Sequence, residues 1–242
     1  YLSQSCPVKK GIDTGKNDRF LRYWHEVSSN KFSFWAYSRK WFAYIKGGRF
    51  RKWYGNFELV VNWENHGEEI KAFKGSTIRN KQYIKKEAIT WSLTSSSNVF
   101  GSRYIPENAV FDNNGSSAFP NSNKEYIMAF MNSKPTSTFL VIMNPTMAFQ
   151  VGNIANLPYI YNASINVSPL VKTCTNIEKQ DWDVHETSWD FKGNELIRMQ
   201  HNCMANSADV NMLDEDERQE LLASVTPLNI NFVMNCVEAY KN

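Results

Sequence analysis

The stretch from Lys46 to Asn56, KGGRFRKWYGN, combines cations with aromatic rings at close spacing. Its cations are Lys46, Arg49, Arg51 and Lys52, and its aromatic residues are Phe50, Trp53 and Tyr54. Guanidinium and ammonium groups bind phosphate oxygens, and flat rings stack on unpaired bases. The stretch therefore indicates a nucleic-acid contact. The alternatives are a solvated basic turn and, for Trp53 and Tyr54, packing in the core.

Two glycines and two strand-forming segments are expected to position this stretch. Gly47 and Gly48 allow backbone angles that other residues resist, so they predict a tight turn that lets the backbone approach a phosphate. The flanking sequences WFAYI and FELVVNW are rich in residues that favour strands. We expect a hairpin with a basic turn, followed by a strand over 50–54 that presents the aromatic rings.

Polar loops supply further candidates for DNA contact. Lys16, Asn17 and Arg19 lie in the first loop, and Arg79 and Asn80 follow a short helix expected over 68–74. These residue types form hydrogen bonds with bases and phosphates. Nothing in the sequence places them relative to the basic stretch.

The pattern of apolar residues changes from strand to helix along the chain. Short strand candidates between about 19 and 112 predict a twisted, largely antiparallel sheet system. The spacing S-x-x-E at Ser122 predicts a capping box for a first helix, and Pro135 is expected to open a second that ends at Asn144-Pro145. The fold class is therefore α+β, with a helical hairpin over about 122–144 packed on the sheet. The segment 149–158 is expected to be extended, and helices are expected over 194–200 and 214–223.

Basic residues are concentrated in the first half of the chain. Residues 1–110 contain 19 Lys and Arg against 9 Asp and Glu, whereas residues 111–242 contain 8 against 15. From residue 39 to residue 52 there are six cations and no acid. This asymmetry predicts a polyanionic partner for the first half.

Several function classes lack their sequence signals. There is no G-x-G-x-x-G or P-loop for a nucleotide and no G-x-S-x-G elbow. The four cysteines and four histidines have no zinc or nucleophile spacing, so we expect neither a metal site nor catalytic residues. The long cysteine spacings favour free buried thiols in a reducing cytoplasm. No apolar run is long enough to span a membrane, and no signal peptide is visible. The chain does not begin with Met and is expected to be a piece of a longer protein.

Seven stretches of the sequence carry a family resemblance. They occupy residues 11–24, 40–67, 89–92, 102–120, 130–134, 144–158 and 181–191. In this order they resemble the C-terminal target-recognition region of the adenine-specific DNA methyltransferases of BREX phage-defence systems, the PglX family. They are more distantly similar to the specificity domains of type I and fused type II restriction-modification enzymes. Residues 202–242 depart from the longer coiled-coil-like extension that the family leads us to expect.

The resemblance implies a domain plan and a role. Residues 1–10 would lead in from an upstream methyltransferase domain, residues 11–198 would recognise the DNA target, and residues 199–242 would form an acidic helical tail. The parent enzyme would bind S-adenosylmethionine and methylate the exocyclic amine of adenine, while this part supplies no catalytic group. Implied partners are double-stranded DNA, the upstream domain, other BREX components and a phage DNA-mimic inhibitor.

Other functions stay open at this point. One is a protein-interaction module whose basic stretch binds an acidic or DNA-mimicking partner. Another is the specificity domain of a type IIG restriction-modification enzyme, and a third is an RNA-binding surface, which the aromatic residues suggest.

Overall fold

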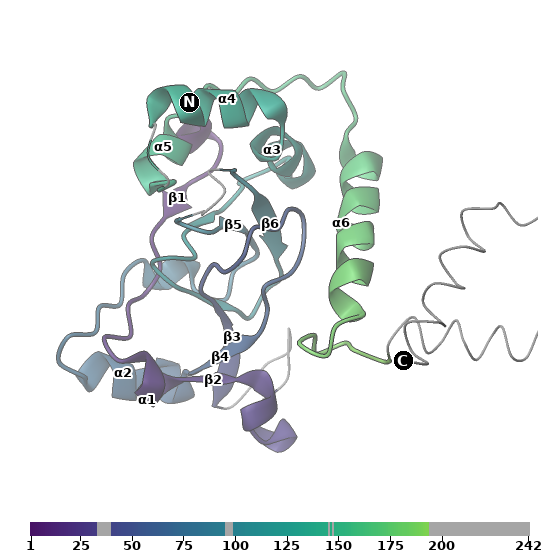
Figure 1. Ribbon diagram of the computed structural model, residues 1–242. Coiled ribbons are helices and arrows are strands. Elements are labelled where there is room, and N and C mark those ends of the chain that lie inside the picture. The colour runs from purple at the N-terminus through teal and green to yellow at the C-terminus, as the bar shows by residue number, and fades with distance from the viewer. Residues whose placement is uncertain (33–39, 95–98, 145, 147, 194–242) are drawn as a thin grey trace, which may run out of the picture. The chain divides into compact units, whose positions relative to one another are not determined.

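The structure is a computed structural model that describes residues 1–32, 40–94, 99–144, 146 and 148–193 (Figure 1). Residues Tyr1–Lys192 form one compact unit. It contains two four-stranded sheets and several helices, which confirms the α+β prediction. The helices expected over 194–200 and 214–223 lie outside the described residues.

The first sheet has the strand order β1-β8-β5-β6 and is antiparallel throughout. Its strands are β1 (Val8–Lys9), β8 (Ser117–Ala118), β5 (Ala88–Trp91) and β6 (Ser102–Ile105). All four residues of β5 are buried, and the indole Nε1 of Trp91 donates a hydrogen bond of 2.8 Å to the Phe149 carbonyl. Both faces of β5 are therefore buried in the core, and the one polar ring atom of Trp91 has a hydrogen-bond partner.

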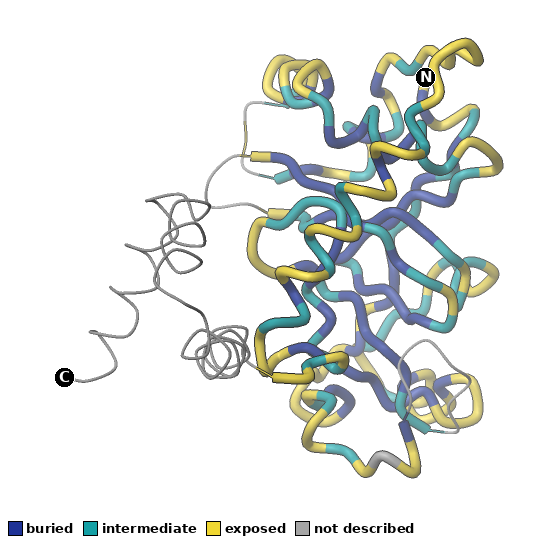
Figure 2. The backbone as a smooth tube through the Cα atoms, turned by 90° about the vertical axis from the view of Figure 1, so that its right-hand side faces the viewer, coloured by how far each residue is buried: buried dark blue, intermediate teal, exposed yellow. Residues whose placement is uncertain are grey.

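The second sheet has the order β2-β4-β3-β7. Its strands are β2 (Leu21–Tyr23), β4 (Leu59–Asn62), β3 (Trp41–Ile45) and β7 (Val110–Phe111). The pairs β2–β4 and β3–β4 are antiparallel, whereas β3 and β7 are parallel. The strands expected around the basic stretch are therefore present as β3 and β4. Figure 2 shows the buried backbone running through the centre of the molecule.

The helical hairpin is confirmed as α3 (Lys124–Met131) and α4 (Lys134–Met143). Apolar side chains of both helices, including Ile127, Met131 and Leu140, share one core cluster with Ile89 and Trp91 of the first sheet. Pro135 lies in the first turn of α4, and the helix ends at Met143 as the Asn-Pro pair predicts. Both ends of α4 are therefore set by local sequence.

The remaining helices are short, except for α6. They are α1 (Asn17–Phe20), α2 (Glu68–Ala72), α5 (Val151–Ala155) and α6 (Ser168–Asp183), with 3₁₀ turns η1 (Leu2–Gln4), η2 (Trp24–Glu26), η3 (Ser29–Lys31), η4 (Glu64–His66) and η5 (Lys81–Tyr83). In Figure 1, α1 and α2 lie beside the second sheet, and α3, α4 and α5 gather at the other end. Within the described part of the chain, no helix has both the length and the apolar character needed to cross a membrane.

Several local predictions were wrong or incomplete. Residues 50–54 form no strand, because Trp53 makes only an isolated bridge to Arg103. The cap of α3 is Asn123 in a left-handed conformation with no side-chain cap hydrogen bond, so Ser122 forms no capping box. The segment 149–158 contains α5 instead of an extended piece. The long helix α6 was not predicted, and the sheets also extend beyond residues 19–112 through β1 and β8.

Candidate nucleic-acid interface

Residues 46–58 connect β3 to β4 as a long loop, which we call the basic loop. Gly47 and Gly48 adopt φ angles of +100° and +109°, which other residues resist, but the tight turn predicted at this pair is wrong, because the whole segment 46–58 joins the two strands. A Cβ on Gly48 would lie 2.8 Å from the Nδ2 atom of Asn56. That same Nδ2 donates a hydrogen bond of 2.8 Å to the Arg49 carbonyl, which closes the loop on itself. The glycine is required both by its angle and by this close approach.

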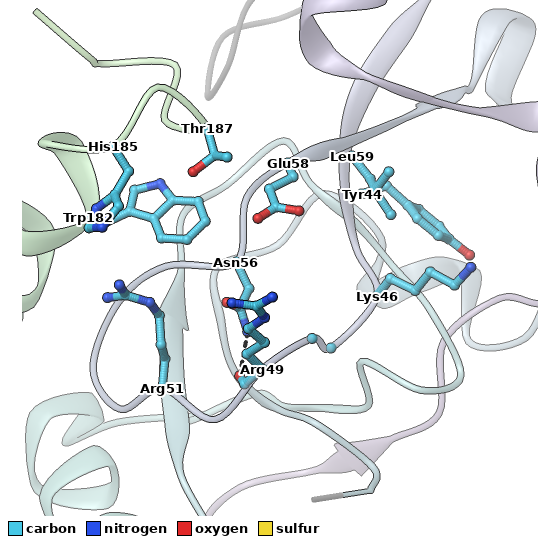
Figure 3. A pocket seen from close by; sticks show the side chains of 12 residues that line it. Tyr44, Lys46, Arg49, Arg51, Asn56, Glu58, Leu59, Trp182, His185 and Thr187 are labelled. Atoms are coloured by element: carbon cyan, nitrogen blue, oxygen red, sulfur yellow. Dashed lines mark hydrogen bonds between the residues drawn. The ribbon is translucent and has the colours of Figure 1, made fainter. Parts of the chain in front are cut away.

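The basic loop forms one side of a pocket of about 640 Å³ (Figure 3). Residues at the end of α6 and after it also line the pocket, together with one residue each of β3 and β4. The lining residues are Tyr44, Lys46, Gly47, Gly48, Arg49, Arg51, Asn56, Glu58, Leu59, Trp182, His185 and Thr187. Five predicted site residues thus meet in one concave surface.

Lys46 and Arg49 are the lining cations that form no ion pair among the described residues, although the charge of Lys46 acts to lower the pKa of Asp112. Arg49 is exposed and Lys46 is partly exposed. Among the described residues, no carboxylate lies within ion-pair distance of either side chain.

Arg51 has partners within the chain. Its guanidinium forms ion pairs with Asp181 at 2.8 Å and Glu178 at 3.4 Å, and it lies 5.1 Å from the ring centroid of Trp182. These residues belong to α6, so Arg51 ties the basic loop to that helix. Its contact with DNA stays a prediction, and such a contact would have to compete with α6.

Lys52 also has a partner within the chain. Its Nζ atom donates a hydrogen bond of 3.0 Å to the carbonyl of Asn132, the residue that ends α3. A cation at a helix C-terminus interacts favourably with the helix dipole and satisfies a carbonyl that has no partner in the helix. The side chain of Asn132 in turn pairs with the Ser102 backbone through bonds of 2.9 and 3.1 Å. Lys52 therefore links the basic loop to the C-terminal end of α3, and through Asn132 to β6 of the first sheet.

The aromatic residues of the basic loop pack inward to different degrees. Tyr54 is buried in a core cluster, and the Nζ atom of Lys179 lies 5.1 Å above its ring. Burial raises the pKa of Tyr54. Trp53 is partly buried against the cluster beneath the first sheet, and its backbone bonds to Ser102 and Tyr104 of β6. Tyr54 therefore packs in the core, which was the alternative to a contact with a base. Phe50 is exposed.

The further candidates for DNA contact, which were predicted in polar loops, lie away from the pocket. Lys16 and Arg79 are exposed, Asn17 accepts a hydrogen bond of 2.8 Å from the Thr14 hydroxyl, and Arg19 forms an ion pair of 2.8 Å with Glu69. Asn80 donates a hydrogen bond of 2.8 Å to the Lys10 carbonyl. The bridge between Asp13 and Thr77 brings these two segments together, beside α1 and α2. They form a group of their own, and none of them lines the pocket.

Buried polar side chains support the base of the basic loop. The hydroxyl of Tyr44 donates a hydrogen bond of 2.5 Å to Asp112, and the amide of Asp112 donates 2.8 Å to the Ile45 carbonyl. Burial raises the pKa of Asp112, although hydrogen bonds from Tyr44 and Asn114 oppose the change. Arg103, which is 1% exposed, donates 3.3 Å to the Gly47 carbonyl, and its burial lowers its pKa to about 10. The guanidinium therefore stays charged at neutral pH and holds the first loop glycine.

Neither metal ligation nor thiol chemistry is indicated in the described part of the chain. No group of three or more His, Cys, Asp or Glu side chains gathers there in a way that could hold a metal ion. Burial raises the pKa of Cys6 to about 12, so this thiol is protonated and unreactive at neutral pH. Cys174 is partly buried and free.

Several lining residues were not predicted from the sequence, notably Glu58, Trp182, His185 and Thr187. The last three lie in DWDVHETSWDF, which contributed to the family resemblance but carried no site prediction. Their only local signal was the joint occurrence of aromatic, acidic and hydroxyl side chains. Asn56 ends the basic stretch and Glu58 comes two residues later, just before β4, so polar residues between cations and a strand were the usable signal there.

Comparison with known proteins gives two relatives. No protein-family model matches the chain. It is 41% identical over 211 residues, 81% of its length, to an adenine-specific methyltransferase PglX from Lacticaseibacillus casei strain Zhang. It is 37% identical over 238 residues, 96% of its length, to an adenine-specific methyltransferase BrxX from Escherichia coli O9:H4 strain HS. The matches cover 18% and 19% of those proteins, so the chain spans about a fifth of the relatives. Over most of its length, the chain is homologous to the adenine-specific methyltransferases PglX and BrxX.

Proposed function

We propose that this chain is the DNA target-recognition module of a larger BREX-type methyltransferase that modifies the exocyclic amine of adenine. The homology to PglX and BrxX supports the parent activity. The observation that carries the module's role is the pair of cations without a described carboxylate partner, Lys46 and Arg49, at a pocket between the basic loop and α6. S-adenosylmethionine and the catalytic groups belong to the parent outside this chain.

The division of labour follows from the chemistry of base methylation. An adenine inside a duplex is not accessible, so the parent must extrude it while another surface recognises the flanking sequence. Lys46, Arg49 and the backbone at Gly47–Gly48 bind phosphates and fix the position on the duplex. The polar groups inside the pocket are then brought near base edges, where sequence is recognised.

The test compares two pairs of alanine substitutions in the parent methyltransferase. Lys46→Ala with Arg49→Ala is expected to weaken binding to duplex DNA and to lower the slope of log K against log salt by about one unit for each phosphate that is no longer neutralised. The matched control is Lys71→Ala with Lys74→Ala, two exposed cations near α2 that do not line the pocket. An unchanged salt slope and an unchanged methylation rate in the loop variant contradict the proposal.

A second candidate function is the binding of an acidic protein partner. The pairing of Arg51 with Glu178 and Asp181 favours it, because the basic loop already binds carboxylates of its own chain. The same variants distinguish the two functions: a protein-binding module would bind duplex DNA equally well before and after the loop substitutions.

A third alternative is the specificity domain of a type IIG enzyme. It differs from the proposed module only because its parent enzyme also cleaves DNA, and a nuclease assay of the parent detects this activity.

A further inference from the structure

Glu58 is the carboxylate among the described residues that line the pocket. It lies at the end of the basic loop, immediately before β4, and its backbone carbonyl accepts a hydrogen bond of 3.0 Å from the Trp24 amide. Figure 3 shows its carboxylate directed into the pocket, toward Asn56, with Trp182 to one side. The backbone bond fixes the point from which the side chain extends.

The Glu58 carboxylate makes no hydrogen bond and no ion pair with any described residue. This is notable because three cations, Lys46, Arg49 and Arg51, line the same pocket. Arg51 pairs with two acids of α6 instead. Three other acids of the first half form ion pairs: Glu64 with Lys40, Glu69 with Arg19 and Glu87 with Lys124. Glu58 therefore keeps its acceptor capacity open toward the pocket.

A carboxylate is unsuited to a surface that only binds phosphates. It repels the polyanion at short range and cancels part of the attraction that neighbouring cations supply. The same group is well suited to a base edge that carries hydrogen-bond donors, because carboxylates accept from the exocyclic amino group of cytosine in the major groove. Adenine presents an amino group in that groove too. Guanine and thymine present oxygen acceptors at the corresponding positions, which a carboxylate disfavours.

We propose that Glu58 is a specificity-determining residue that accepts a hydrogen bond from the amino group of one cytosine or adenine of the target sequence. The inference rests on the proposed function and specifies its chemistry. Lys46 and Arg49 attract the backbone, and the Glu58 carboxylate then rejects sequences that present an acceptor at this position. Asn56 acts as a positioning residue, since its bond to the Arg49 carbonyl holds the loop beside Glu58.

The experiment uses the parent methyltransferase with Glu58→Gln and Glu58→Ala. Methylated positions are mapped on genomic DNA by sequencing that detects N6-methyladenine, and binding is measured on duplexes carrying each base at every target position. Both variants are expected to relax the recognised sequence at one position, with a roughly tenfold or greater loss of discrimination between an amino-bearing base and its alternatives. Glu107→Gln is the matched control, because Glu107 is an exposed acid outside the pocket. Thermal unfolding identifies any variant that fails to fold, and the near-isosteric Gln keeps the test valid if Ala does not.

The outcomes separate this inference from the proposed function. If the target sequence is unchanged in both folded variants while Lys46→Ala and Arg49→Ala weaken DNA binding, the inference is wrong and the proposed function stands. If the Glu58 variants bind all sequences more tightly without altered discrimination, the carboxylate only repels phosphates and the inference is also wrong. If the Lys46 and Arg49 variants bind DNA like the parent, the proposed function itself fails.

Discussion

The Nη2 atom of Arg51 lies 2.8 Å from the Oδ2 atom of Asp181, which joins the basic loop to α6 across 130 residues of sequence. Glu178 adds a second contact at 3.4 Å, and Trp182 provides a ring beneath the guanidinium. The two acids neutralise a cation that would otherwise face the pocket. The helix therefore sets how much positive charge the basic loop presents.

Removing these acids is expected to strengthen DNA binding that does not depend on sequence. In the parent enzyme, Glu178→Gln with Asp181→Asn frees Arg51 and should raise the magnitude of the salt slope by about one unit on scrambled duplexes. Fluorescence anisotropy at several salt concentrations measures it. Glu186→Gln is the control, since Glu186 is an exposed acid of the same segment and outside the pocket. An identical slope in the double variant and the parent contradicts competition between α6 and DNA for Arg51.

Lys52 is expected to contribute to stability more than to DNA binding. Lys52→Ala removes the hydrogen bond to the Asn132 carbonyl at the end of α3 and should cost about 1 kcal/mol of unfolding free energy. Urea unfolding of the chain measures this, and Lys134→Ala, at an exposed position in the first turn of α4, should stay within about 0.5 kcal/mol of the original protein. If Lys52→Ala leaves the stability unchanged but lowers the affinity for DNA, the prediction is wrong and Lys52 contacts a phosphate instead.

Gly48 and Gly152 form a matched pair of glycine sites. Gly48→Ala introduces a side chain at φ +109° and within 2.8 Å of Asn56, and should destabilise the chain by about 1–3 kcal/mol. Gly152 lies in α5, where an added Cβ meets no atom within 4 Å, so Gly152→Ala should stabilise by about 0.5–1 kcal/mol. Thermal and urea unfolding compare the two. Equal effects would mean that the basic loop does not require its left-handed backbone.

Glu87 gives a pH-dependent prediction. Partial burial raises the pKa of this carboxyl, but hydrogen bonds from Lys124 and Tyr104 outweigh the burial and lower it below the ordinary value. A lowered pKa in the folded state means that the stabilisation is present above the unfolded-state pKa and is lost as the pH falls through the folded-state value. Because the side chains of Lys124 and Glu87 are 33% and 38% exposed, solvent screens the pair, and Glu87→Gln should cost only about 0.5–1 kcal/mol at neutral pH.

The free-energy difference between Glu87→Gln and the original chain should shrink progressively at acidic pH, below the ordinary glutamate range. Urea unfolding at a series of pH values measures it, with Glu107→Gln as an exposed control. A difference that is constant from neutral to acidic pH would show that the charge of Glu87 contributes nothing.

Local sequence was sufficient where the structure depends on neighbours in the chain. The two strands around the basic loop, the left-handed glycines and the limits of α4 all follow from residues within a few positions. The missed helix α6 buries only Val171 and Trp182 while Leu170 and Ile177 are exposed, so it lacks a continuous apolar stripe. In α5, Gly152 and Asn153 lower the helix propensity, so the pattern there gave no helix signal.

The cations of the candidate site were predictable from the sequence, but the ion pairs and hydrogen bonds that they form were not. The cations of the basic loop were named from the sequence, yet nothing local distinguishes Arg49, which has no described ion pair, from Arg51, which has two. The partners of Arg51 and Lys52 lie 130 and 80 residues further along the chain. Such contacts are created by tertiary packing alone, and the same is true of the position of Glu58 opposite α6.

The pairing of Val8 in β1 with Ala118 in β8 has a consequence for synthesis of the protein. The two strands are separated by about 110 residues, so at about 5–20 residues per second the second strand leaves the ribosome roughly 5–20 s after the first. During this interval Leu2, Cys6 and Val8, which end in the core, have no partner sheet and are open to water and to other nascent chains. Nascent chains that pause before residue 117 are therefore expected to need chaperones, and slow closure of the first sheet should dominate the folding time.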